Sequence, residues 1–82
     1  MNLFVSNLSR SVNEDALKAL FSEFGSVVSV KIINDKQTGL SKGFGFVEMA
    51  NESHGMTAIA KLSDAEFFGR RILVSKAKPR TN

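Results

Sequence analysis

The chain has 82 residues, of which 43% are hydrophobic and 23% are charged, so it has room for one small folded domain rather than a disordered segment. It contains no cysteine and one histidine, His54, which excludes disulfides and thiolate metal sites, and we expect neither a metal nor another cofactor. No apolar run approaches membrane-spanning length, and the residues after Met1 lack the features of a signal peptide. We therefore expect a cytoplasmic protein that does not associate with membranes.

The net charge of +3 is distributed unevenly. Residues 70–82 contain five basic residues and no acidic one, whereas residues 1–69 contain the remaining six bases and all eight acids. A basic end on a slightly acidic body is typical of contact with a polyanion, and it is also typical of a solubilising tail. Charge alone leaves both interpretations open.

Hydrophobic periodicity and turn residues predict an alternation of strands and helices along the chain. Asn13 is a predicted helix N-cap, and apolar residues at helical spacing follow it until Gly25. In chain order, the predicted elements are a strand at residues 3–5, a helix from Asn13 to Gly25, a strand at residues 27–33, a strand at residues 42–49, a helix opening at Asn51 or Glu52, and a strand at residues 71–75.

This β-α-β-β-α-β order predicts an α+β fold, the ferredoxin-like βαββαβ sandwich. In that fold a four-stranded antiparallel sheet carries two helices on one face. We expect a single domain over residues 1–82, with its core at about residues 2–77 and a basic tail at residues 78–82. The other face of the sheet is left open, so each strand should alternate apolar side chains toward the helices with polar side chains outward.

Three phenylalanines break this alternation. Phe44 and Phe46 fall on the face that carries Lys42, and Phe4 falls on the outward face of the first strand. The helices can be covered without them, by the predicted inward set Leu3, Val5, Val30, Ile32, Val47, Met49, Ile72 and Val74. Exposed apolar clusters mark binding surfaces. Rings interleaved with cations suit a ligand with flat bases and phosphates, because stacking contributes roughly 1–3 kcal/mol per base.

Gly43 and Gly45 flank Phe44 in the strand at 42–49. Two glycines with no third glycine and no following helix are a weak signal for a phosphate-binding loop. We expect instead that these small residues allow a helix to pack closely beneath the sheet.

The segment Lys42–Met49 resembles the ribonucleoprotein octamer of RNA recognition motif domains, and it matches that pattern at every specified position except the last, Met49. The segment Leu3–Leu8 resembles the companion hexamer of the same family. The two segments are separated by one predicted helix and one predicted strand, in the order found in the family. The resemblance extends over nearly the whole chain.

The resemblance implies that the hexamer and octamer strands lie side by side at the centre of the sheet. It further implies that Phe4 and Phe44 stack on adjacent bases, that Phe46 packs against sugars between them, and that Lys42 pairs with a backbone phosphate. Family members also use residues just after the last strand to bind base edges, here Ser75, Lys76, Ala77 and Lys78.

We therefore predict that the chain binds single-stranded RNA as a monomer, in post-transcriptional regulation or RNA chaperoning. Single-stranded DNA stays open as a partner, because no motif here fixes contacts to the 2′-hydroxyl. The predicted RNA-binding residues are Phe4, Ser6, Lys31, Ile33, Lys42, Phe44, Phe46, Arg71, Ser75, Lys76 and Lys78.

Two other functions compete with RNA binding. A protein-interaction domain of the same fold is the main alternative, although relatives that act in this way often lack the sheet aromatics. An enzyme would need a nucleophile with a base, or paired carboxylates, and the sequence offers neither set. Glu48, on the aromatic face, is better suited to tuning base preference than to acting as a general acid. We therefore expect no catalytic residues.

Overall fold

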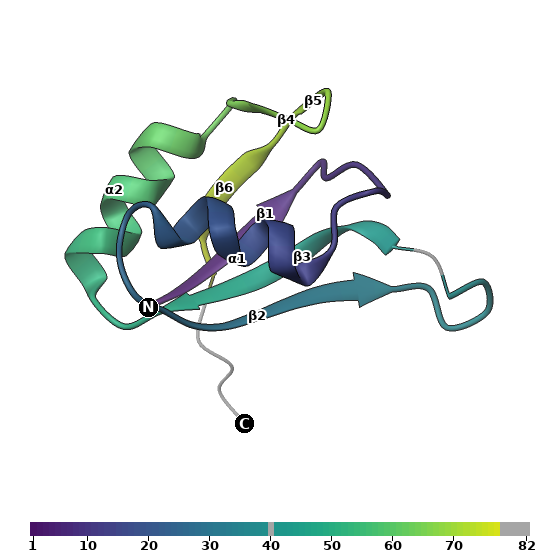
Figure 1. Cartoon of the computed structure of the whole chain (residues 1–82), viewed down its shortest axis with the longest axis horizontal. Helices are drawn as coiled ribbons and strands as arrows, with labels where there is room; N and C mark the ends of the chain where they lie inside the picture. The colour runs from purple at the N-terminus through teal and green to yellow at the C-terminus, as the bar shows by residue number, and fades with distance from the viewer. Residues whose placement is uncertain (40, 78–82) are drawn as a thin grey trace.

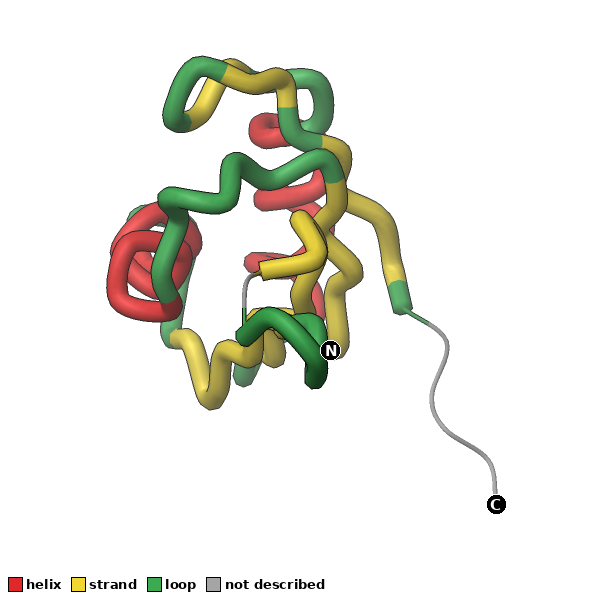
Figure 2. Tube along the Cα trace, turned by 90° about the vertical axis from the view of Figure 1, so that its right-hand side faces the viewer, coloured by secondary structure: helices red, strands yellow, loops and turns green. Residues whose placement is uncertain are grey.

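A computed structural model of the chain describes residues 1–39 and 41–77, without the side chains of Ser41 and Lys42. Figure 1 shows both helices on one face of the sheet, and the side view of Figure 2 shows the strands (yellow) beside the helices (red). The described residues form β1 (Asn2–Ser6), α1 (Glu14–Ser22), β2 (Val27–Asn34), β3 (Ser41–Met49), α2 (Glu52–Leu62), β4 (Glu66–Phe67), β5 (Arg70–Arg71) and β6 (Leu73–Lys76). Among them, no helix has the length and apolar character needed to cross a membrane.

Within the described residues, four strands form one sheet in the order β2-β3-β1-β6, with each strand antiparallel to its neighbour. The predicted fold class is therefore confirmed, including the central position of β1 and β3. Asn13 caps α1 as predicted, because its Oδ1 accepts a hydrogen bond from the backbone N–H of Ala16 at 2.8 Å. The helix ends at Ser22, earlier than the predicted end at Gly25.

The main difference from the predicted elements lies before the last strand. Arg70–Arg71 pairs with Glu66–Phe67 in a separate hairpin, and β6 begins at Leu73. The hairpin turn consists of Phe68 and Gly69, both with positive φ, at 54° and 80°. Two consecutive positive φ angles are required in a type I′ turn. Phenylalanine is uncommon in this conformation, which explains why sequence reasoning did not find the turn.

The core lies between the inward face of the sheet and the two helices. Phe21 and Leu17 of α1 are fully buried, and Ala58 and Leu62 of α2 close the layer. The predicted inward set is confirmed in the structure, with Val30 half-buried and the others buried: Leu3, Val5, Ile32, Val47, Met49, Ile72 and Val74. The core therefore closes without the three phenylalanines of the open face.

The two glycines of β3 accommodate neighbouring backbone, so the prediction that they make room for a helix was wrong. A Cβ atom added to Gly45 would lie 2.5 Å from the backbone oxygen of Lys31, and its other near neighbours are also backbone atoms of β2. Gly43 has a φ of +86°, and its carbonyl accepts a hydrogen bond from the N–H of Leu8 at 2.8 Å. Both glycines thus allow β3 to follow the adjacent chain closely.

We expect Gly45→Ala to lower the free energy of unfolding by about 1–3 kcal/mol, because the new methyl group would push β3 away from β2. Urea denaturation followed by circular dichroism measures this change. The control is Ser75→Ala at an exposed strand position, which should change stability by no more than about 0.5 kcal/mol. Equal stability of Gly45→Ala and the unmodified protein would contradict the close approach of the two strands.

Candidate nucleic-acid interface

Three phenylalanine rings form one cluster on the sheet face that the helices leave open. Phe4 of β1 lies between the two rings of β3, with its centroid 5.8 Å from Phe44 and 5.4 Å from Phe46 and with interplanar angles of 47° and 51°. These tilted contacts fall in the favourable range for aromatic pairs. Phe46 is 38% exposed, and the other two rings are half-buried. The cluster therefore offers flat apolar surface to a ligand.

A single row of paired residues crosses the sheet through this cluster. Lys31 of β2 lies opposite Phe46, Phe46 lies opposite Phe4, and Phe4 lies opposite Ser75 of β6. Because residues directly opposite each other in a sheet share a face, the row places a cation on one side of the rings and a hydroxyl on the other. Lys31 and Ser75 are both exposed, as their predicted roles require.

A hollow opens beside Phe46, on the β2 side of the cluster. It contains the predicted residues Lys31, Ile33 and Phe46. The hydroxyl of Ser29 donates a hydrogen bond to Oε1 of Glu48 at 3.4 Å on the same surface. The full lining consists of Asn2, Ser29, Lys31, Ile33, Phe46, Glu48 and Ala77.

A second hollow lies beside Phe44, where β1 ends. Asn7 organises it, because its Oδ1 accepts a hydrogen bond from Nη2 of Arg70 and its Nδ2 donates one to the carbonyl of Arg71, both at 2.6 Å. Asn7 has a φ of 59°, a conformation that asparagine tolerates better than most residues. The lining residues are Ser6, Asn7, Leu8, Arg10, Gly43, Phe44 and Arg70.

Sequence reasoning did not select Arg10, Asn7 or Arg70 as site residues. Asn7 did appear within the hexamer, which was the available signal for its importance. The position of Arg70 depends on the hairpin that was not predicted. Ser6 lies in this hollow as a predicted site residue, and it pairs with Leu73, whose side chain is 54% exposed.

Two predicted cations lie away from the aromatic cluster. Arg71 belongs to the β4–β5 hairpin rather than to the main sheet, and its Nη1 lies 3.7 Å from Oδ2 of Asp64. Lys76 lies opposite the buried Leu3, and its Nζ lies 3.9 Å from Oε1 of Glu52 at the start of α2. Strand alternation therefore directs the Lys76 side chain toward the helix layer. The structure does not bring either cation to the phenylalanine rings.

The last two predicted cations fall outside what the structure describes. Lys42 lies in β3, but its side chain is not among the described atoms, and Lys78 is outside the described residues. At Ala77 the chain still follows β1, because the N–H of Ala77 donates a hydrogen bond to the carbonyl of Asn2 at 2.9 Å. The open face is thus defined up to that residue.

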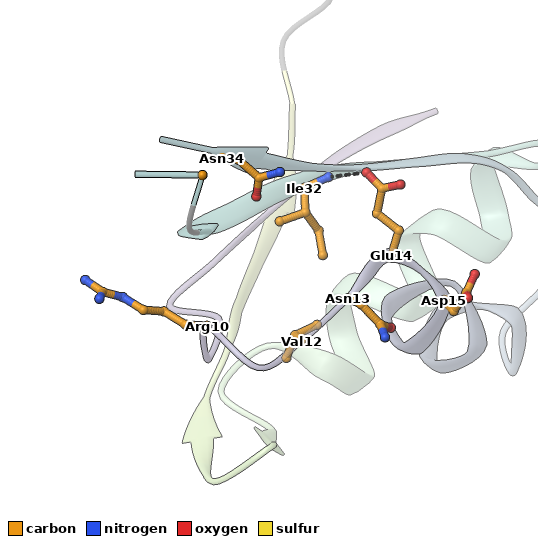
Figure 3. Close-up of a pocket in the computed structure, with 8 residues that line it drawn as sticks. Arg10, Val12, Asn13, Glu14, Asp15, Ile32 and Asn34 are labelled. Carbon is orange, nitrogen blue, oxygen red and sulfur yellow. Dashed lines mark hydrogen bonds between the residues drawn. The ribbon is translucent and has the colours of Figure 1, made fainter. Parts of the chain in front are cut away.

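A third hollow, between the start of α1 and β2, is built from groups with structural roles (Figure 3). Oε2 of Glu14 accepts a hydrogen bond from the N–H of Ile32 at 3.0 Å, which satisfies a donor on the edge strand. Figure 3 also shows the Arg10 guanidinium extending away from the Glu14 and Asp15 carboxylates. Among the described residues, no group of three or more potential metal ligands exists. Within the described residues, this hollow therefore holds no candidate metal site.

We expect Asn7→Ala to lower the free energy of unfolding by about 2 kcal/mol, because it removes two hydrogen bonds and places alanine at positive φ. Asn7→Gly separates the two effects, since glycine adopts that φ freely, and should cost about 1 kcal/mol. Urea denaturation of both variants provides the comparison. Two variants as stable as the unmodified chain would show that Asn7 does not hold the hairpin.

The family model described as RNA recognition motif matches residues 3–73. The chain is 48% identical over 80 residues to a protein of Nostoc sp. (strain PCC 7120) named "Putative RNA-binding protein RbpA", and the match covers 98% of this chain and 78% of that protein. It is 44% identical to "RNA-binding protein CP31B, chloroplastic" of Arabidopsis thaliana, over 96% of this chain and 27% of the relative.

Two solved structures share the fold closely. The crystal structure of RNA binding protein PG1 superposes with a TM-score of 0.95 at 44% identity, covering 100% of this chain and 99% of that one. The structure titled "SXL-LETHAL PROTEIN/RNA COMPLEX" has a TM-score of 0.90 at 32% identity, covering 98% of this chain and 48% of that one. On the family match and these similarities together, the chain belongs to the RNA recognition motif family.

Proposed function

We propose that the open sheet face binds single-stranded RNA, with bases stacked on the phenylalanine rings and phosphates held by neighbouring cations. The observation that carries this proposal is the contiguous cluster of Phe4, Phe44 and Phe46 opposite the helix layer. An apolar cluster in that position has no role in the core. The relatives whose names describe RNA-binding proteins support the proposal.

The exposure of the three rings suggests which part of the RNA each one contacts. Phe46 is the most exposed of the three and forms a wall of the hollow that contains Lys31 and Glu48. Phe46 is therefore better placed to stack on a base than to pack against sugars, which is the role that the family resemblance implied. Phe4 lies next to it in register and can stack the neighbouring base. Phe44 borders a hollow lined by two arginines, which suits the sugar-phosphate backbone.

The cations near the rings supply the electrostatic part of binding. Lys31 is exposed beside Phe46, and Arg10 and Arg70 flank Phe44 at the other end of the cluster. Each phosphate neutralised on a single strand contributes about −0.7 to the slope of log K against log salt. Two or three stacked bases with a few such contacts give a micromolar dissociation constant, about −8 kcal/mol. Such short, modest recognition suits post-transcriptional regulation or RNA chaperoning.

We expect the double variant Phe44→Ala/Phe46→Ala to bind a randomised single-stranded RNA pool at least about fivefold more weakly, because a base stacked on Phe46 is worth roughly 1–3 kcal/mol and the Phe44 contact to the sugar-phosphate backbone is removed with it. The label must be on the RNA, since the chain has no Trp and no Tyr, and fluorescence anisotropy at two salt concentrations is the readout. Phe68→Ala is the matched control, because it removes a 50% exposed ring from the hairpin instead of the sheet.

The outcomes separate the competing functions. Equal binding by the double variant and the unmodified protein, with steep salt dependence, would reduce the interaction to phosphate contacts outside the rings. Absence of RNA binding by the folded protein would contradict the proposal and favour a protein partner for the open face. A matching DNA pool in parallel reports whether the 2′-hydroxyl contributes.

A further inference from the structure

The hollow beside Phe46 combines an aromatic wall with polar groups from two strands. Its volume of about 350 Å³ is at the small end of the range of roughly 300–1,000 Å³ for ligand sites. A base stacked on Phe46 would direct its edge toward the side chains of β2 and β3. The long polar side chains there are Lys31 and Glu48.

Glu48 is an unexpected residue on a face that binds a polyanion, because its charge repels phosphates. It lies opposite Ser29 on one side and Asn2 on the other, and one of its oxygens accepts the Ser29 hydrogen bond. Among the residues whose side chains are described, Glu48 takes part in no ion pair. A carboxylate has about four acceptor sites, so most of its capacity is available to a ligand.

Lys31 provides the complementary group. It lies opposite Phe46, is exposed, and forms no ion pair within the described part of the chain. Its ammonium group donates hydrogen bonds and accepts none. Diagonal neighbours on adjacent strands are about 7–8 Å apart, which long side chains can span. Of the long polar side chains, the edge of a base on Phe46 would therefore meet one donor group, that of Lys31, and one pair of acceptors, those of Glu48, beside the shorter Ser29 and Asn2.

The four RNA bases differ in how they match this arrangement. The Watson–Crick edge of guanine presents the acceptor O6 followed by two adjacent donors, N1–H and the N2 amino group. Uracil has one donor between two acceptors, and adenine and cytosine each present a single amino group beside an acceptor nitrogen. Guanine is thus the base that can donate two parallel hydrogen bonds to one carboxylate while accepting a third from a cation.

We propose that this hollow selects guanine, with the Glu48 carboxylate accepting from N1–H and the N2 amino group and with Lys31 donating to O6. The inference rests on the proposed function, because it assumes that RNA bases stack on Phe46. It gives the acidic residue a role in base selection that outweighs its repulsion of phosphates.

The test uses short uridine oligoribonucleotides in which one central position is G, A, C, U or inosine. The unmodified protein should bind the G oligonucleotide at least about fivefold more tightly than the all-U one, the lower end of discrimination by a bidentate pair. Inosine should lose part of this preference, because it lacks the N2 amino group. Fluorescence anisotropy with labelled RNA measures all five.

Glu48→Gln should reduce the preference for G to less than about twofold, because its amide N–H would face a donor of the base. Its affinity for the all-U oligonucleotide should stay equal or increase, since a negative charge is removed from the face. Glu23→Gln makes the same charge change at an exposed residue that follows α1, and it should keep the full preference. Circular dichroism checks that both variants are folded.

Retention of the G preference in Glu48→Gln would overturn the assignment, as would an unmodified protein that binds all five oligonucleotides equally or prefers A or C. These results differ from failure of the proposed function, in which neither the oligonucleotides nor the randomised pool would bind. That last outcome would overturn the inference together with the function on which it rests.

Discussion

The antiparallel pairing of β1 with β3 determines both the core and the candidate site. On one face of this pair, Leu3 lies opposite Val47 and both are fully buried; on the other face, Phe4 lies opposite Phe46 and both are accessible. Because side chains alternate along a strand, a shift of one residue in this register would exchange the two faces. The core and the aromatic cluster therefore depend on the same alignment. Gly45 supports it by letting β2 approach β3 from the other side.

The apolar residues of the sheet thus fall into two sets, one that forms the core and one that lies on the open face. The inward set packs against α1 and α2 and accounts for the stability of the fold, since these side chains are removed from water. The outward phenylalanines keep accessible surface that stability alone would not favour. A hollow at each end of the cluster extends it, one with Lys31 and Glu48 and one with Arg10 and Arg70. Stacking surface, charge and hydrogen-bonding groups are thereby joined on one open face.

Alternation along the strands was sufficient to predict the fold class and the outward position of Phe4, Phe44 and Phe46. It was not sufficient where the path of the chain depends on a turn. The positive φ angles of Phe68 and Gly69 form a hairpin that places Arg71 outside the main sheet. No pattern in the sequence predicts a phenylalanine with positive φ. The alternation that places Ile72 and Val74 inward also places Lys76 on the helix side, opposite Leu3. Its predicted binding role came from the family resemblance and conflicts with that alternation.

The measurement that tests the account most directly is NMR observation of intermolecular NOEs between the isotope-labelled protein and a bound single-stranded RNA. We predict NOEs from the ring protons of Phe4, Phe44 and Phe46 to base and ribose protons, and none from Phe21, which is fully buried beneath the sheet. A complex in which the RNA gives NOEs only to α1 and α2, and none to the ring protons of the open face, would contradict the account.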